Sequence, residues 1–229
     1  FLFVSSNLFS QVAIIPEPVS IVQKPGEYKF GNSISISADQ SNAAIKKTAD
    51  WLTEKLSVTG LPVSVIGEKG NIQLALNKSG NNLIGKEGYS LVSSPDGIII
   101  SANEPAGLFY GVQTLLQLMP PAVESKAIVK NINWAVPFVE IADYPRFGWR
   151  GLMFDISRHF FNKDQIKQYI DAMVRYKYNL LHLTLSNDEG WRVEIKALPK
   201  LNSIGSWNVK RTGTFGNFIP PTDNEPRDY

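Results

Sequence analysis

Two stretches in the first part of the chain space their hydrophobic residues at helical intervals. Residues 41–56 and 105–119 each place apolar side chains on one helical face, and Pro120 ends the second stretch because proline cannot continue a helix. The apolar positions are Ile45, Ala49, Leu52 and Leu56 in the first stretch, and Leu108, Val112, Leu115 and Met119 in the second. This spacing predicts two amphipathic helices.

Short apolar or alternating runs lie around these helices and are typical of strands. Ser33–Ser37 alternates as a half-buried strand does, and Ser94-Pro95-Asp96-Gly97 favours a tight turn between two such runs. The pattern predicts an α+β domain over residues 12–143, with a mixed sheet and two helices on one side. The expected strands are 33–37, 63–66, 72–76, 89–92, 98–101 and 138–142.

The remainder, residues 144–229, begins with a strand–helix–strand pattern. Gly151–Asp155 is a short apolar run, and Leu180–Leu185 is a second one. Between them Asn162 can cap a helix that carries Ile166, Ile170, Met173 and Val174, with Gln165 closing the cap and Asn179 as the expected stop. Two such strands joined by one helix predict a parallel βαβ unit with a right-handed crossover.

Polar residues follow each of these two strands. Asp155, Arg158 and His159 come after the first, and Asn187, Asp188 and Glu189 come after the second. Because ligands of parallel α/β folds bind beyond the carboxyl ends of the strands, these groups are expected to share one rim. His182, between leucines in the second strand, is expected to be a core residue.

Composition limits the partners and cofactors that the chain can be expected to bind. A net charge of +2 without a basic cluster argues against nucleic acid as a partner. The absence of Cys and the presence of only two His exclude disulfides and make a zinc site implausible, so neither metal nor cofactor is expected. Residues 1–11 are apolar and too short to span a bilayer, and they fit a signal-peptide remnant or a disordered terminus. Export is the expectation that we favour.

The residues around these strands also resemble a known family. The run Trp149-Arg150-Gly151-Leu152, with Asp155, Arg158 and His159 after it, resembles the opening strand of the catalytic barrel of glycoside hydrolase family 20, the β-N-acetylhexosaminidases. Ser186–Arg192, with the sequence SNDEGWR, resembles the second strand and loop of that family. The part before residue 144 resembles its smaller N-terminal domain. The resemblance therefore implies a (β/α)8 barrel.

Such a barrel takes about 250 residues, whereas residues 144–229 leave room for its first βαβ portion alone, so we expect a truncated barrel. The resembled family hydrolyses terminal GlcNAc or GalNAc with the acetamido group of the substrate as nucleophile. Its catalytic Asp-Glu pair follows a His-x-Gly-Gly pattern that these 229 residues lack. Asp188-Glu189 matches the second-strand loop instead. No catalytic residue is therefore expected here, and the 229-residue chain alone should be inactive.

The resemblance also suggests site residues. Arg150 is expected to bind sugar hydroxyls, with a salt bridge at the start of the strand as the alternative, and Asn187 and Asp188 are also assigned to substrate binding. Many family members carry two Asp at these last positions, the first of which pairs with a His elsewhere, so Asn187 departs from the pattern. The remaining rim residues are expected to order the rim, with sugar stacking a second role for Trp191: Asp155, Arg158, His159, Trp191 and Arg192.

The implied function is that of the N-terminal portion of an exo-β-N-acetylhexosaminidase. Its partners would be N-acetylhexosamine-containing oligosaccharides or glycoconjugates, with no membrane span. Two alternatives stay open at this point. One is another barrel glycosidase with a similar leading domain, and the other is a non-catalytic carbohydrate-binding protein on the same scaffold.

Overall fold

The computed structural model describes residues 12–67, 69–187, 189–209 and 227–228. Contacts divide the chain into two compact units, Phe1–Gly148 and Trp149–Tyr229. The signal-peptide remnant or disordered terminus suggested for residues 1–11 lies outside the described residues. In the part that is described, no helix is both long enough and apolar enough to cross a membrane.

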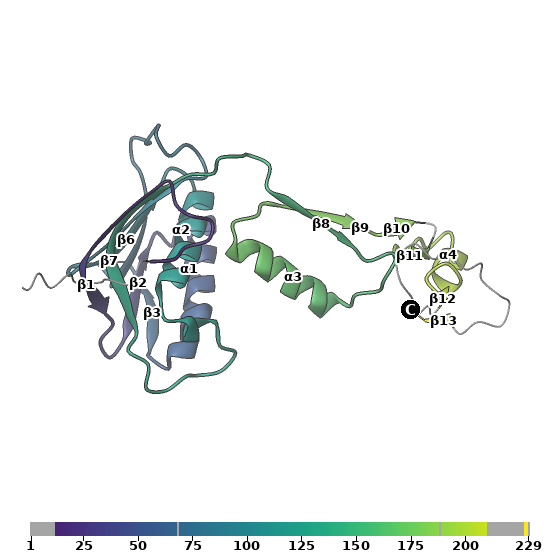
Figure 1. Ribbon diagram of the computed structural model, residues 1–229, viewed down its shortest axis with the longest axis horizontal. Coiled ribbons are helices and arrows are strands. Elements are labelled where there is room, and N and C mark those ends of the chain that lie inside the picture. The colour runs from purple at the N-terminus through teal and green to yellow at the C-terminus, as the bar shows by residue number, and fades with distance from the viewer. Residues whose placement is uncertain (1–11, 68, 188, 210–226, 229) are drawn as a thin grey trace, which may run out of the picture. The chain divides into compact units, whose positions relative to one another are not determined.

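The first unit is built on a seven-stranded mixed sheet (Figure 1). Its spatial order is β1-β7-β5-β6-β4-β2-β3. The pairs β2–β3, β2–β4 and β4–β6 are parallel, whereas β5–β6, β5–β7 and β1–β7 are antiparallel. The bounds are β1 (Ser20–Lys29), β2 (Ile34–Ala38), β3 (Val63–Ile66), β4 (Ile72–Leu76), β5 (Tyr89–Ser94), β6 (Gly97–Ala102) and β7 (Ala135–Asp143).

Two helices, α1 (Ala43–Leu56) and α2 (Pro105–Leu118), cover one face of this sheet (Figure 1). Asn42 starts α1, because its side chain accepts hydrogen bonds from the first free backbone N–H groups. Pro105 opens α2, where a missing N–H costs nothing. The apolar stripes of both helices meet the inward side chains of the sheet in one continuous core. This arrangement agrees with the predicted α+β domain.

The sequence did not predict β1. Its side chains are almost all exposed, so it lacks the alternation that marks a half-buried strand. The pairing with β7 shifts between Gln23 and Glu27, where Gly26 has a φ of 104°. A Cβ on Gly26 would lie 2.5 Å from the Phe138 ring, so glycine is required there for both reasons.

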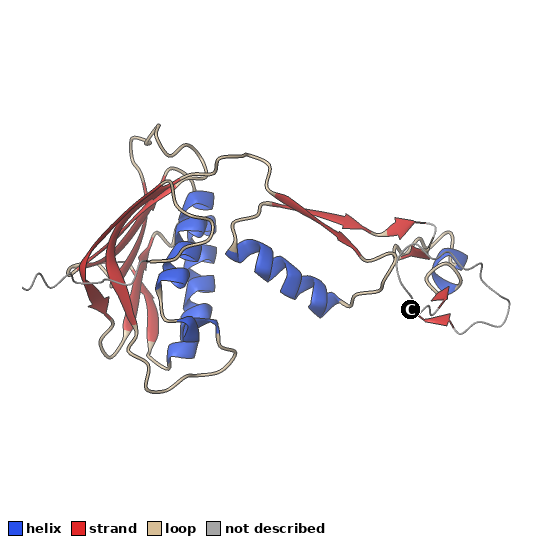
Figure 2. Cartoon of the chain, in the orientation of Figure 1, coloured by secondary structure: helices blue, strands red, loops and turns tan. Residues whose placement is uncertain are grey.

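The second unit contains the parallel pair β8 (Gly151–Asp155) and β9 (Leu180–Thr184), joined by α3 (Lys163–Arg175) (Figure 2). Asn162 caps α3 in a complete capping box with Gln165. The Phe154 ring stacks on Tyr169 of α3 at 4.3 Å between centroids. One face of the strand pair is therefore packed against the helix.

The opposite face of the pair carries Met153 and His182, which are partners in register and are both exposed. The expectation that His182 is a core residue is wrong for the described structure. A histidine between leucines on a strand alternates to the other face, and that face has no cover among the residues that are described.

The end of α3 also differs from the prediction. The helix ends at Arg175, and Lys177 takes the left-handed conformation with a φ of 61°, so Asn179 is not the stop. Asn179 instead starts the strand pairing. Its side chain accepts a hydrogen bond from the Arg150 N–H, and its own N–H donates to the Arg150 carbonyl oxygen.

Short elements complete the second unit. A hairpin of two short strands, β10 and β11, is followed by one helical turn, α4, and by a second antiparallel pair, β12 and β13. Residues 210–226 and 229 lie outside the described residues. The bounds are β10 (Ser186–Asn187), β11 (Gly190–Trp191), α4 (Lys200–Ser203), β12 (Asn208–Val209) and β13 (Arg227–Asp228).

Candidate active site

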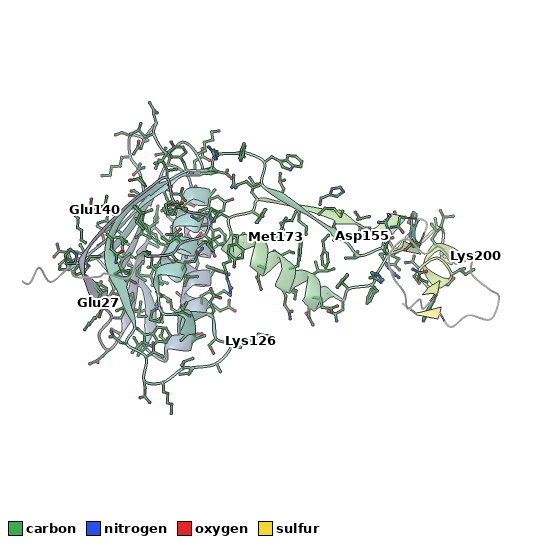
Figure 3. The ribbon with its side chains drawn as sticks, in the orientation of Figure 1. Glu27, Lys126, Glu140, Asp155, Met173 and Lys200 are labelled. Carbon is green, nitrogen blue, oxygen red and sulfur yellow. The ribbon has the colours of Figure 1, made fainter. Side chains whose placement is uncertain are left out.

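The candidate site is the rim formed where β8 and β9 end. Asp155, which is labelled in Figure 3, is the last residue of β8. Its Oδ1 accepts hydrogen bonds from the N–H groups of Ser157 at 2.9 Å and Arg158 at 3.1 Å. Its Oδ2 pairs with Nη1 of Arg158. One carboxylate thus closes the turn after β8 and holds a guanidinium, which orients Arg158 at the rim.

The charge of Asp155 follows from these contacts. Partial burial opposes ionisation, but the N–H groups of Arg158 and Ser157 and the Arg158 guanidinium outweigh it, so they lower the pKa of this carboxyl below its usual value. The Asp155 side chain is 18% exposed and that of Arg158 is 53% exposed. The carboxylate therefore serves the turn, and the guanidinium is the group that can reach a ligand.

The turn after β9 is organised by Asn187. Its Oδ1 accepts a hydrogen bond from the Glu189 N–H at 2.8 Å, while its Nδ2 is buried and has no hydrogen-bond partner among the described residues. Asp188, assigned to substrate binding from the sequence, lies outside the residues that the structure describes. An amide at position 187 can donate a hydrogen bond where a carboxylate could only accept one.

A buried hydrogen bond joins the two turns. Ser157 is completely buried, and its Oγ donates to the Gly190 carbonyl oxygen at 2.5 Å. A Cβ on Gly190 would lie 2.5 Å from the Ser157 carbonyl oxygen, so only glycine allows this approach. Sequence reasoning did not single out either residue, although a small polar residue inside the Asp155–Arg158 segment was a usable signal.

Trp191 and Arg192 continue from the second turn into backbone contacts. Trp191 donates from Nε1 to the Val193 carbonyl oxygen at 2.5 Å and is half-buried. Arg192 donates from its guanidinium to three carbonyl oxygens, those of Ile156, Ser157 and Ser206, and lies 5.4 Å from the centre of the Phe160 ring. These contacts connect the β8 turn to the chain after β11. His159, in contrast, is exposed at the rim.

Arg150 is not brought together with this rim. It precedes the amino end of β8, whereas Asp155 and Arg158 lie at the carboxyl end. Its Nε donates to the Lys177 carbonyl oxygen at 2.8 Å, in the loop after α3. The salt bridge that was named as the alternative for Arg150 stays a prediction. Arg150 supports the backbone at the opposite end of the strands.

The described residues hold no group of three or more His, Asp or Glu side chains placed to bind a metal ion. The described part of the rim offers hydrogen-bond donors. It presents one half-exposed guanidinium, the exposed His159 and the buried amide of Asn187 at the end of two parallel strands. Hydroxyl and carbonyl oxygens of a polar ligand suit these donors.

Two family models match the chain. They are described as "Glycosyl hydrolase family 20, domain 2", over residues 11–144, and "Glycosyl hydrolase family 20, catalytic domain", over residues 147–223. The mixed sheet with its two helices corresponds to the first, and the β8–α3–β9 unit with its rim corresponds to the start of the second. By these two matches, the chain is of the glycoside hydrolase class.

Known proteins agree with these matches. A beta-hexosaminidase from Porphyromonas gingivalis is 35% identical over 220 residues, covering 95% of this chain and 28% of that protein. A Streptomyces plicatus beta-hexosaminidase mutant in complex with the product GlcNAc is 42% identical, with a TM-score of 0.77 over 83% of this chain and 38% of that one. A Bacteroides fragilis beta-N-acetylhexosaminidase is 30% identical, with a TM-score of 0.70 over 85% of this chain and 38% of that one.

The chain belongs to glycosyl hydrolase family 20. It spans well under half the length of the relatives just described.

Proposed function

We propose that this chain is the N-terminal portion of an exo-β-N-acetylhexosaminidase, which removes terminal GlcNAc or GalNAc from non-reducing ends. The observation that carries the proposal is the rim, where the turns after β8 and β9 are joined and present Arg158. Family membership supports it, and so do the names of the Porphyromonas and Bacteroides relatives. Neither the family nor these names favours the alternatives of a different glycosidase or a non-catalytic binder.

We also propose that β8, α3 and β9 are the first βαβ portion of a (β/α)8 barrel. The strands are parallel, one face packs on α3, and the other face exposes Met153 and His182. Barrel strands bury both faces, one against the helices and one in the barrel interior. Further parallel strands that closed the barrel would enclose the exposed face in its interior.

Within this function, Arg158 is a better candidate than Arg150 for binding sugar hydroxyls. Arg158 lies at the carboxyl end of β8, where ligands of parallel barrels bind, and half of its side chain is exposed. The planar guanidinium can donate to two neighbouring hydroxyls while Asp155 fixes its direction. Arg150 lies at the other end and already donates to a backbone carbonyl oxygen.

The mechanism implied by the family is substrate-assisted. The acetamido oxygen of the substrate attacks the anomeric carbon, a Glu protonates the leaving oxygen, and an Asp orients the acetamido group. We place that Asp-Glu pair on a later strand of the barrel. The residues described here would then hold the non-reducing sugar, and no step of the reaction is assigned to Glu189.

Hydrolysis of aryl N-acetyl-β-glucosaminides and galactosaminides tests the function. The full-length protein should release the aryl group, and the 229-residue chain, with its mass verified, should not. Binding of the sugar without turnover by the full-length protein would establish the non-catalytic alternative. Turnover by the 229-residue chain would place the catalytic groups within it and contradict the assignment to a later strand.

A matched pair of variants tests the choice of arginine. In the full-length protein we expect Arg158→Ala to lower kcat/KM by roughly 10- to 150-fold, the value of a lost hydrogen bond to a charged group. Arg150→Ala should lower thermal stability with less effect on KM. The opposite ranking would return the substrate-binding role to Arg150.

A further inference from the structure

Arg192 is connected to the Asp155 turn in a way that the family assignment does not explain. Three peptide groups join Asp155 to Arg158, and the last two of them are Ile156–Ser157 and Ser157–Arg158. Asp155 Oδ1 accepts from the N–H side of both, at 2.9 and 3.1 Å. Arg192 donates to the carbonyl side of both, from Nε to Ile156 at 3.1 Å and from Nη2 to Ser157 at 3.2 Å.

We infer that Arg192 is a positioning residue that sets the direction of the Arg158 guanidinium. The inference rests on the proposed function, in which Arg158 binds the sugar. Both peptide planes are fixed between a carboxylate on one side and a guanidinium on the other. The Cα of Arg158 follows the second plane directly, so a rotation of that plane would move the whole Arg158 side chain.

The choice of arginine follows from the geometry. Two carbonyl oxygens of successive residues need two donors at a fixed separation, and a guanidinium has five N–H donors in one plane. A lysine ammonium is a compact group on a flexible stem and cannot hold both carbonyls in fixed directions. A third donor, Nη1, contacts the Ser206 carbonyl oxygen, so the chain after α4 is connected to the same group.

Direct contact between Arg192 and substrate is the weaker alternative. Its guanidinium is engaged by three backbone carbonyl oxygens, lies at the Phe160 ring and is part-buried. Arg158, in contrast, is half-exposed. The effect of Arg192 on a ligand should therefore pass through the turn, and that dependence can be measured.

A double-mutant cycle in the full-length protein tests this dependence. Arg192→Met keeps much of the side-chain volume but removes the donors, and we expect it to lower kcat/KM by up to roughly 100-fold, mainly through KM. In an Arg158→Ala background the same change should cost less than about threefold, because the group that it positions is gone. Losses that simply multiply would overturn the inference and leave Arg192 a general structural residue.

Two further variants sharpen the cycle. Arg192→Lys keeps the positive charge and packs more conservatively, so it should fold, yet it should not restore KM. Full rescue by lysine would show that charge alone matters and would overturn the two-carbonyl argument. Lys196→Met removes an exposed cation four residues further along the chain and serves as the matched control, with unchanged KM.

A second measurement does not depend on turnover. Hydrogen exchange of the Ser157 and Arg158 amides should be on the order of tenfold faster in Arg192→Met and Arg192→Lys than in the wild-type protein or Lys196→Met. Unchanged exchange at both amides would overturn the inference. A wild-type protein that hydrolyses no hexosaminide would contradict the proposed function, and exchange would still decide the role of Arg192.

Discussion

The two units of this chain differ most in how completely they bury their apolar side chains. In the first unit, fully buried leucines and isoleucines from a seven-stranded sheet and two helices form one core. In the second, Ile156 and Met173 are the only buried apolar residues among those described, and the strand residues Leu152, Leu181 and Leu183 are half-buried. Figure 3 labels Met173 on α3.

The large core and the candidate site therefore lie in different units of the chain. The first unit has a core of its own and, in its described residues, no group that we assign to chemistry. The second unit places its polar groups on turns that are fixed by hydrogen bonds rather than by a packed hydrophobic core. Turns at the carboxyl ends of strands can vary in sequence without disturbing a sheet, which is why sites occur there.

The largest effect is expected when one leucine in each unit is replaced by alanine. Leu115 of α2 is completely buried, so Leu115→Ala should lower the free energy of unfolding of the first unit by about 2–5 kcal/mol. Leu183→Ala should leave that transition in place. Urea unfolding followed by circular dichroism measures both. Equal shifts from the two variants would show that the units share one cooperative core.

A smaller effect is expected at a buried tyrosine. The Tyr89 hydroxyl donates to Asp143 Oδ2 at 3.0 Å and contacts Thr114 Oγ1 at 2.6 Å. Burial and the negative charge of Asp143 raise the pKa of Tyr89, so it stays a neutral donor.

Tyr89→Phe should therefore cost roughly 1–3 kcal/mol, because it leaves buried polar groups without a partner. Tyr169→Phe in the second unit removes only a 3.4 Å contact to the Met153 carbonyl oxygen and should cost less. Thermal unfolding compares the two variants. A larger loss from Tyr169→Phe would reverse the contrast between the units.

The helix caps provide a comparison with nearly identical chemistry. Asn42 and Asn162 each accept two backbone hydrogen bonds at the start of α1 and α3. Replacement of either by alanine should cost about 0.5–2 kcal/mol. Native-state hydrogen exchange should show the Asn162→Ala loss confined to α3, since few core contacts hold that helix, whereas Asn42→Ala should weaken the first unit as a whole. Local loss in both helices would mean that α1 is no better anchored than α3.

The smallest expected effect is the pH response of the Asp155 turn. The pKa of the Asp155 carboxyl is lowered in the folded protein. The stability that this carboxylate contributes is therefore fully present above its pKa in the unfolded chain, about 4, and is lost as the pH falls through its pKa in the folded protein. Asp155→Asn keeps an oxygen acceptor but cannot titrate. Melting temperatures should therefore fall less steeply with acid in this variant than in the wild-type chain. Parallel curves would assign the acid response to other carboxyls.

Much of the fold could be predicted where local signals were strong. The bounds of β3 and β4 matched the expected ranges, and the turn at Pro95 and Asp96 joins β5 to β6 as expected. Both helices of the first unit and the capping box of α3 were also predicted. These elements have stripes, caps or turn residues, which act within a few positions of the chain.

Other features depend on distant partners and could not be read locally. The edge strand β1 is exposed along its length, so it has no burial pattern. The stop of α3 was assigned to Asn179, yet Lys177 has the left-handed backbone, and Asn179 is used to pair with Arg150.

The rim was predicted as a group, but its internal contacts were not. Sequence reasoning placed Asp155 and Arg158 together because they follow one strand. The hydrogen bonds from Ser157 and Arg192 join residues more than thirty positions apart, and no spacing rule predicts them. Arg150 was selected from its surroundings in the sequence although it directly precedes the amino end of β8, and the contact of its Nε with the Lys177 carbonyl oxygen appears only in the structure.

The parallel pairing of β8 and β9 has a consequence for how the protein is made. The N-terminal unit emerges from the ribosome first, and the hydrophobic side chains of its core all belong to that unit. In the proposed barrel, the outer edges of β8 and β9 would stay unpaired until the strands adjacent to them are synthesised. Exposed edges of this kind can pair with other chains, so this interval during translation is where chaperone binding should protect the nascent chain from aggregation.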